Sequence, residues 1–179
     1  MKLPQRKPTR LDGFDYSAPG AYFVTICTKD KKCLLSEIVG EGLCPLPKNR
    51  LTPIGEEIKS SIRFINDNYP GVTIDRYVIM PNHIHLIVII DTGGDGTPPL
   101  QDIIGRLKSY TTGKYGAELW QRSFHDHIIR GEKDYIKIAE YIDTNPLKWE
   151  LDCFSDVPYF VQLFKKIKGT TPKRYADDI

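Results

Sequence analysis

Short runs of apolar and β-branched residues recur along this chain, and their lengths and spacing predict an alternation of strands and helices. The segment 21–28 is rich in β-branched and aromatic residues, which predicts a strand. Further strands are predicted at 72–80, 83–91 and 120–130. Because every residue from 86 to 90 is apolar, we expect both faces of the sheet to be covered at this strand.

The first predicted helix has a clear start. Thr52 suits the N-cap position and Pro53 the first helical position, and isoleucines at helical spacing follow them as far as residue 65, which predicts a helix ending near Asn68. Residues 36–50, which precede it, hold several Gly and Pro residues. We expect this segment to form a loop or a short hairpin.

Two more helices are predicted in the second half of the chain. One starts at Leu100 and ends near Gly113 or Gly116, where glycine favours a helix end. The other spans residues 134–144. It is expected to stop before Pro146, because proline disfavours helical geometry in the residue that precedes it.

The predicted order is strand, helix, strand, strand, helix, strand, helix, which indicates an α+β fold. The first six elements match the split β-α-β arrangement of a ferredoxin-like antiparallel sheet, with two helices on one face. The seventh is an additional C-terminal helix, free to pack elsewhere. We expect a basic N-terminal arm at 1–20, one domain at 21–150 and a C-terminal tail at 151–179, with a short helix at 158–168.

Charge is nearly balanced over the 179 residues, with 25 basic and 23 acidic side chains, so composition alone does not indicate a nucleic-acid-binding protein. The basic residues gather near the two ends, where they suit either phosphate contacts or plain solvation. No apolar run is long enough to span a membrane, and the first residues lack an apolar leader. We therefore expect no membrane partner and a cytoplasmic location.

His83 and His85 are the first candidates for chemistry. Residues two apart on a strand project from the same face, so both imidazoles can bind one divalent cation while Ile84 points to the other face. The alternative is a pair of surface or core-edge histidines that binds no metal.

Tyr141 and Asn145 lie four residues apart on the predicted third helix and therefore share a face. Ile138 and Ile142 lie to one side of them, which places Tyr141 at the edge of the buried stripe. Such a position suits a ring held by packing with its hydroxyl exposed to a site, and it equally suits an ordinary amphipathic tyrosine.

His125 and His127 form a second pair, on the predicted strand 120–130. If this strand neighbours the strand of the first pair, all four histidines could converge on one ion. A structural or DNA-contacting role is the preferred interpretation of His127. The segment Trp120–Phe124 mixes aromatic, basic and polar groups, which suits stacking on bases and contacts to phosphates.

Several of these segments together resemble the single-tyrosine HUH transposases, most closely the REP-associated tyrosine transposase group of bacteria. The histidine pair lies in YVIMPNHIHLIVII, and the other matching segments, in order, are GFDYSAPGAYFVTICT, LQDIIGRLKSYTT, WQRSFHDHIIR and YIDTNPLKW. The resemblance covers residues 6–150, so the implied transposase domain is the one at 21–150. One departure is His125, where the group more often has an aromatic residue.

The resemblance implies a role for each candidate. The family's nucleophilic tyrosine precedes an Asn-Pro step, which corresponds to Tyr141 here, and its histidine pair corresponds to His83 and His85. Its polar metal ligand one helical turn after the tyrosine corresponds to Asn145. The implied cofactor is Mg²⁺ or Mn²⁺. The implied activity is that of a metal-dependent single-stranded DNA endonuclease and strand transferase, which cleaves next to a REP-like hairpin through a 5′-phosphotyrosine.

Single-stranded or hairpin DNA needs stacking surfaces and a positive groove. We expect the contacts to come from the arm, the second helix and the fourth strand, at Arg6, Lys7, Arg10, Lys108, Arg122, His127 and Arg130. Two other functions stay open: a hairpin-binding regulator without turnover, and a metal phosphohydrolase with a four-histidine site. The chain could act as a monomer or as a homodimer.

Overall fold

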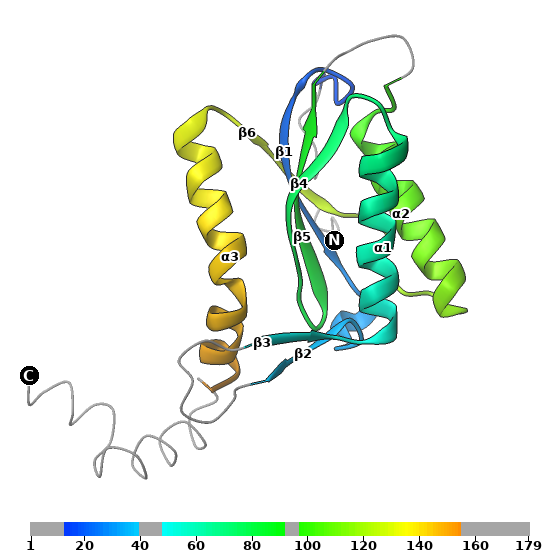
Figure 1. The fold of residues 1–179 in the computed structure, drawn as a ribbon, viewed down its shortest axis with the longest axis vertical. Helices are drawn as coiled ribbons and strands as arrows, with labels where there is room; N and C mark the ends of the chain where they lie inside the picture. Colours follow the sequence, from blue (N-terminus) through cyan, green and yellow to red (C-terminus); the bar gives the residue numbers. More distant parts are fainter. Residues whose placement is uncertain (1–12, 40–47, 92–96, 155–179) are drawn as a thin grey trace, which may run out of the picture.

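The computed structural model describes residues 13–39, 48–91 and 97–154 of the chain. At its centre is a four-stranded antiparallel sheet with the strand order β4-β5-β1-β6 (Figure 1). The strands are β1 (Gly20–Cys27), β4 (Val72–Ile79), β5 (His83–Ile90) and β6 (His125–Ile129). With one helix after β1 and another after β5, this is the ferredoxin-like split β-α-β topology that the sequence predicts.

Alternation along the central strands gives the sheet two different faces. Val24 of β1 pairs with Leu86 of β5, and both are fully buried. The next pair along, Thr25 with His85, therefore projects from the opposite face. One face is thus mainly apolar, with Asp126 of β6 beside Val24, and the other carries the histidines.

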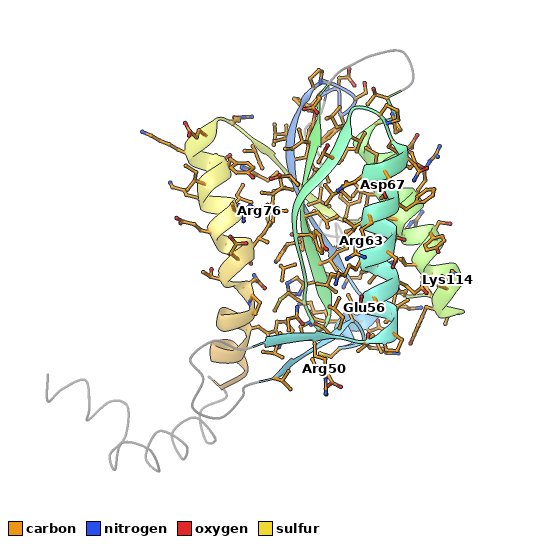
Figure 2. All side chains as sticks on the ribbon, in the orientation of Figure 1. Arg50, Glu56, Arg63, Asp67, Arg76 and Lys114 are labelled. Atoms are coloured by element: carbon orange, nitrogen blue, oxygen red, sulfur yellow. The ribbon has the colours of Figure 1, made fainter. Side chains whose placement is uncertain are left out.

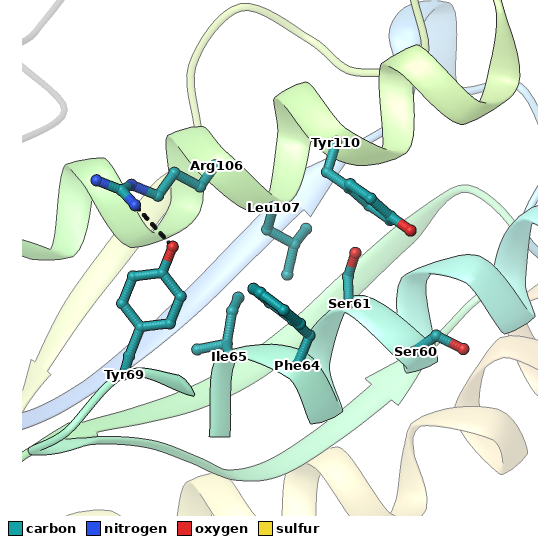
Figure 3. Close-up of a pocket in the computed structure, with 8 residues that line it drawn as sticks. All are labelled: Ser60, Ser61, Phe64, Ile65, Tyr69, Arg106, Leu107 and Tyr110. Carbon is teal, nitrogen blue, oxygen red and sulfur yellow. Dashed lines mark hydrogen bonds between the residues drawn. The ribbon is translucent and has the colours of Figure 1, made fainter. Parts of the chain in front are cut away.

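Two helices, α1 (Pro53–Asn68) and α2 (Leu100–Tyr115), cover the apolar face (Figure 1). The predicted start of α1 is confirmed, since the Thr52 hydroxyl accepts a hydrogen bond from the Gly55 backbone at 3.2 Å. Ile58 and Ile62 of α1 lie in the same core cluster as Leu107 of α2. Between the two helices lies a groove of about 550 Å³, which Figure 3 shows with Arg106 of α2 donating to the Tyr69 hydroxyl. This groove is on the side of the sheet away from the histidines.

The third helix, α3 (Glu132–Phe154), lies on the opposite side of the sheet (Figure 1). The prediction that it ends before Pro146 is wrong, because the helix runs through the proline for two more turns. A proline removes one backbone hydrogen bond from a helix, but it leaves the bonds of the flanking turns in place. Beyond the proline, the Trp149 ring packs 5.7 Å from the His83 ring, and this contact favours the longer helix. The expected domain boundary at residue 150 therefore falls inside α3.

A small hairpin of β2 (Ser36–Val39) and β3 (Lys48–Leu51) realises the hairpin alternative for residues 36–50. It is attached to the end of β4, where the Ser36 hydroxyl and the Asn49 side-chain amide both donate to the Ile79 carbonyl, at 2.8 and 2.6 Å. A short 3-10 turn, η1 (Lys29–Lys31), connects β1 to the segment leading into this hairpin. The hairpin and η1 both lie at the end of the sheet where β5 begins (Figure 1).

Two other predicted segments differ from the structure or fall outside it. The predicted strand 120–130 is shorter than expected, because Trp120 forms an isolated bridge with Thr28 and β6 starts at His125. Within the predicted arm 1–20, Tyr16 belongs to the hydrophobic core. The predicted short helix at 158–168 lies outside the described residues. Among the helices that the structure describes, none is long and apolar enough to cross a membrane.

Candidate active site

His83 and His85 bring their ring nitrogens together on the sheet face that α3 covers. Their Nε2 atoms lie 3.1 Å apart. Burial lowers the pKa of His83 to about 4 and that of His85 to about 3, and the neighbouring ring of His83 contributes to the latter shift. Both imidazoles are therefore neutral at pH 7, the form in which a histidine can bind a metal ion.

Each imidazole is held in place through its other nitrogen. The Nδ1 atom of His83 lies 2.7 Å from Oδ1 of Asn82, and Nδ1 of His85 lies 2.9 Å from Oγ1 of Thr25. An amide oxygen can only accept, so Nδ1 of His83 carries the proton and its Nε2 is unprotonated, with a lone pair that faces Nε2 of His85. The Thr25 hydroxyl can donate or accept, and it therefore accommodates either tautomer of His85. Such partners orient metal-binding histidines in many proteins.

Tyr141 packs against this pair from α3 within the same chain. Its ring centroid lies 5.2 Å from that of His85 and 6.1 Å from that of Phe23, which itself stacks on His85 at 5.2 Å. The side chain stays 38% exposed, whereas its neighbour Ile142 is buried at 1%. The structure thus gives Tyr141 the predicted position at the edge of the buried stripe, with access from solvent.

Asn145 completes the group, one helical turn after Tyr141. It is 6% exposed and hydrogen-bonds with His83, an interaction that opposes part of the burial-induced fall in the pKa of His83. The four residues predicted to share one site, from β5 and α3, therefore lie together in the fold.

The donor set of this group suits a divalent cation. With Nδ1 of His83 protonated, the 3.1 Å contact between the Nε2 atoms requires Nε2 of His85 to donate to Nε2 of His83, and the Thr25 hydroxyl then donates to Nδ1 of His85. If the Thr25 hydroxyl accepts instead, both Nε2 lone pairs face the same point, and the side chain of Asn145 reaches His83 from the other element. Two imidazoles and an amide oxygen are ligands that Mn²⁺ accepts readily and that Mg²⁺ accepts less well.

The second histidine pair does not join the first. Strand β1 lies between β5 and β6, so the two histidine-bearing strands are not neighbours and the condition for convergence of all four histidines is not met. His127 directs Nε2 to Asp134 at a distance of 2.9 Å, and His125 is exposed. Across the described ranges, no three side chains drawn from His, Cys, Asp and Glu are grouped to hold a metal ion. The four-histidine phosphohydrolase therefore has no geometric support.

The predicted DNA-contacting residues are scattered relative to this group, and their roles stay predictions. Arg122 and Arg130 are exposed near the two ends of β6. Lys108 lies on α2, beyond the opposite face of the sheet, and its ammonium donates to the carbonyls of Gln121 and Arg122 at 2.6 and 3.0 Å. The arm residues Arg6, Lys7 and Arg10 lie outside the described residues.

A polar network fastens α3 to the edge strand β4. Arg76 points from β4 towards α3 (Figure 2), where its guanidinium donates to the Asp143 carboxylate at 2.9 Å. The Tyr135 hydroxyl donates to Asp75, and this hydrogen bond is the main reason that the pKa of Tyr135 is raised. Tyr135 is the other tyrosine on α3 that could act as the nucleophile. Its hydroxyl is hydrogen-bonded to β4 and does not face the histidine pair.

Thr25, Asn82 and Phe23 are the site residues that sequence reasoning missed. Thr25 and Phe23 alternate on β1, but their relevance depends on the register that sets Thr25 opposite His85. Asn82 precedes the histidine pair directly, and a polar residue at that place was a usable signal for an orienting partner.

Comparisons with known proteins identify relatives among the REP-associated tyrosine transposases. No family model matches the chain. An uncharacterised protein of Haemophilus influenzae is 35% identical over 173 residues, which cover 84% of this chain and 93% of that protein. A protein of the same organism named as a REP-associated tyrosine transposase is 27% identical over 161 residues, covering 81% of each chain. The REP-associated tyrosine transposase of Escherichia coli is 30% identical over 108 residues, covering 59% of this chain and 64% of that protein.

A solved structure shares the fold. It is that of a REP-associated tyrosine transposase bound to a REP hairpin, with a TM-score of 0.56 and 23% sequence identity. The similarity covers 83% of this chain and 74% of that chain.

Proposed function

Because the chain belongs to the REP-associated tyrosine transposase family, we propose that it cleaves and rejoins single-stranded DNA next to a hairpin, in a metal-dependent reaction with Tyr141 as nucleophile. The single observation that carries this proposal is the contact of the Tyr141 ring with His85, at 5.2 Å between centroids, beside a His83 that is hydrogen-bonded to Asn145. A partly exposed phenol next to two neutral imidazoles is a suitable arrangement for attack on a phosphodiester.

In the proposed step, Tyr141 Oη attacks the scissile phosphorus, forming a phosphorus–Oη bond while the bond from phosphorus to the 3′ oxygen breaks. The phenolic proton passes to water, and the departing 3′ oxygen takes up a proton to leave a free 3′-OH. The 5′ end stays attached to the enzyme as a phosphotyrosine. Because the phosphodiester energy is kept in that bond, attack by another 3′-OH reverses the step and joins two strands without ATP.

His83, His85 and Asn145 would hold the Mg²⁺ or Mn²⁺ ion. The ion supplies polarisation of the scissile phosphate and stabilisation of the negative charge that develops in the transition state. Asn82 and Thr25 keep the two imidazoles oriented for this task, through contacts of 2.7 and 2.9 Å.

The proposed substrate follows from the family and from the REP hairpin held by the structural relative. A hairpin offers a duplex for recognition and a flanking single strand for cleavage. The exposed Arg122 and Arg130, together with the arm residues Arg6, Lys7 and Arg10, are the proposed phosphate contacts. Lys108 would contribute if the strand passes along α2, and His127 if it passes along β6.

The test is the formation of a covalent protein–DNA adduct that survives denaturing electrophoresis. A DNA single strand that carries a hairpin is incubated with the protein in Mn²⁺ or Mg²⁺. Its label lies on the fragment whose 5′-phosphate would become attached to the tyrosine. Tyr141→Phe is expected to abolish the adduct and to keep hairpin binding, while Tyr135→Phe serves as the matched control on the same helix and keeps both. An adduct that persists in Tyr141→Phe would refute the assignment, and binding without an adduct under any metal condition would indicate a regulator.

A further inference from the structure

We propose that Lys31 binds a phosphodiester oxygen of the DNA strand at this same site, as an additional substrate-binding residue. The inference rests on the proposed function, since it assigns the positive charge that receives the cleaved strand next to the histidine pair. Sequence patterns gave no reason to select Lys31, which is one of many basic residues in the chain.

The first argument is the position of Lys31. It is the last residue of η1, which leaves the sheet directly after β1, and the final residue of β1, Cys27, pairs with His83. One side chain connects the turn to the histidine: Nδ2 of Asn82 donates to the Lys31 carbonyl at 3.3 Å, while its Oδ1 accepts from Nδ1 of His83. The residue that orients His83 therefore also fixes the place of Lys31.

The second argument is that the charge of Lys31 reaches the site. Burial is the main cause of the lowered pKa of His83, and the positive charge of Lys31 lowers it further. The same charge opposes the burial that raises the pKa of the Cys27 thiol. The charge of Lys31 therefore adds to the positive potential at the end of β5, where it would favour a bound phosphate.

The third argument is the availability of this ammonium. The neighbouring Lys29 is paired with Glu118. Within the described parts of the chain, the Lys31 side chain is exposed and has neither an ion pair nor a hydrogen bond of its own. An exposed lysine, on a turn hydrogen-bonded to the residue that orients His83, is suited to bind an anionic ligand, and phosphate is an anion that lysine binds as a point charge.

The fourth argument is the backbone. Asp30 and Lys31 both adopt left-handed conformations, with φ of 57° and 54°. Two consecutive non-glycine residues in this region are strained, and such strain collects at functional sites when the surroundings enforce it. Here Lys31 N–H donates to the Thr28 carbonyl at 3.1 Å, and the Thr28 hydroxyl donates to the Lys32 carbonyl at 2.8 Å.

The experiment compares Lys31→Asn with Lys32→Asn. Asparagine tolerates the left-handed backbone, so the first variant removes the charge and retains the turn, while the second removes an adjacent exposed charge. Affinity for hairpin-bearing single-stranded DNA is measured across a salt series in a Tyr141→Phe background, where no cleavage follows. We expect Lys31→Asn to weaken binding about tenfold or more at low salt and to reduce the slope of log affinity against log salt by about 0.7, the change expected for one lost single-strand phosphate contact.

Lys31→Arg is expected to restore the slope, and far-ultraviolet circular dichroism checks that each variant is folded. Equal affinity and equal slope for Lys31→Asn and Lys32→Asn would overturn the proposal. This outcome is separate from a failure of the proposed function, because the adduct assay on the otherwise unaltered protein reports on cleavage, whereas the salt series reports on one phosphate contact.

Discussion

The buried histidine pair predicts a specific loss of stability in acid. His85 is 5% exposed, and burial lowers its pKa from 6.5 to about 3, with His83 adding to the shift. The unfolded chain therefore binds a proton more tightly than the folded chain, so the stability due to a neutral His85 is present above pH 6.5 and is lost as the pH falls towards 3. For the protein in a chelator, the two pKa values give a loss of about 1 kcal/mol at pH 5.5 and about 3 kcal/mol at pH 4.5.

The matching perturbation is His85→Asn, which keeps a polar group near Thr25 and removes the titrating ring. Urea unfolding in the presence of a chelator gives the free energy of unfolding of both proteins at pH 7.5, 5.5 and 4.5. The difference in unfolding free energy between the natural protein and the variant should fall by about 3 kcal/mol between the first and the last pH. A difference that stays constant over this range would show that His85 is not buried in its neutral form, and the geometry argued for the site would be refuted.

Three further predictions address the metal ligands, their support and the packing of α3. Asn145→Ala should weaken Mn²⁺ binding, measured by calorimetry, and unchanged affinity would remove Asn145 from the ligand set. Thr25→Val should lower the same affinity about 10–100-fold by releasing the His85 ring, and this effect should be missing if Thr25 only fills space. Ile142→Ala, which empties a position that is 1% exposed, should cost about 2–5 kcal/mol of unfolding free energy, against about 0.5 kcal/mol or less beyond helix propensity for the control Ile136→Ala at 46% exposure. Equal losses in the two isoleucine variants would contradict the packing of α3 on the sheet.

Local signals accounted for much of the fold. The start of α1 is set by a Thr-Pro pair whose capping role depends on neighbouring residues alone, and the structure reproduces the predicted bounds of this helix. The unbroken apolar run of β5 likewise indicated a strand covered on both sides, which α1, α2 and α3 now explain. These features could be read from the sequence because each depends on a few adjacent side chains.

Features that depend on distant partners could not be read in this way. The local rule for Pro146 failed because contacts beyond the proline, such as that of Trp149 with His83, act only once the helix lies on the sheet. Whether the four histidines converge could not be decided from the sequence, because strand order, which places β1 between the two pairs, is not a local property. The meeting of Tyr141 and Asn145 with the histidine pair followed from the family resemblance rather than from periodicity, and the structure places them together.

The covalent attachment point tests the central claim most directly. Trypsin separates the two rival tyrosines, since residues 134–137 form a peptide that contains Tyr135 and residues 138–148 form one that contains Tyr141. The natural protein is incubated with hairpin-bearing single-stranded DNA and Mn²⁺, digested with trypsin and nuclease, and analysed by mass spectrometry for a retained nucleotide phosphate. The account predicts this mass on the peptide 138–148, at Tyr141. Its appearance on the peptide 134–137, or on any other residue, would contradict the account.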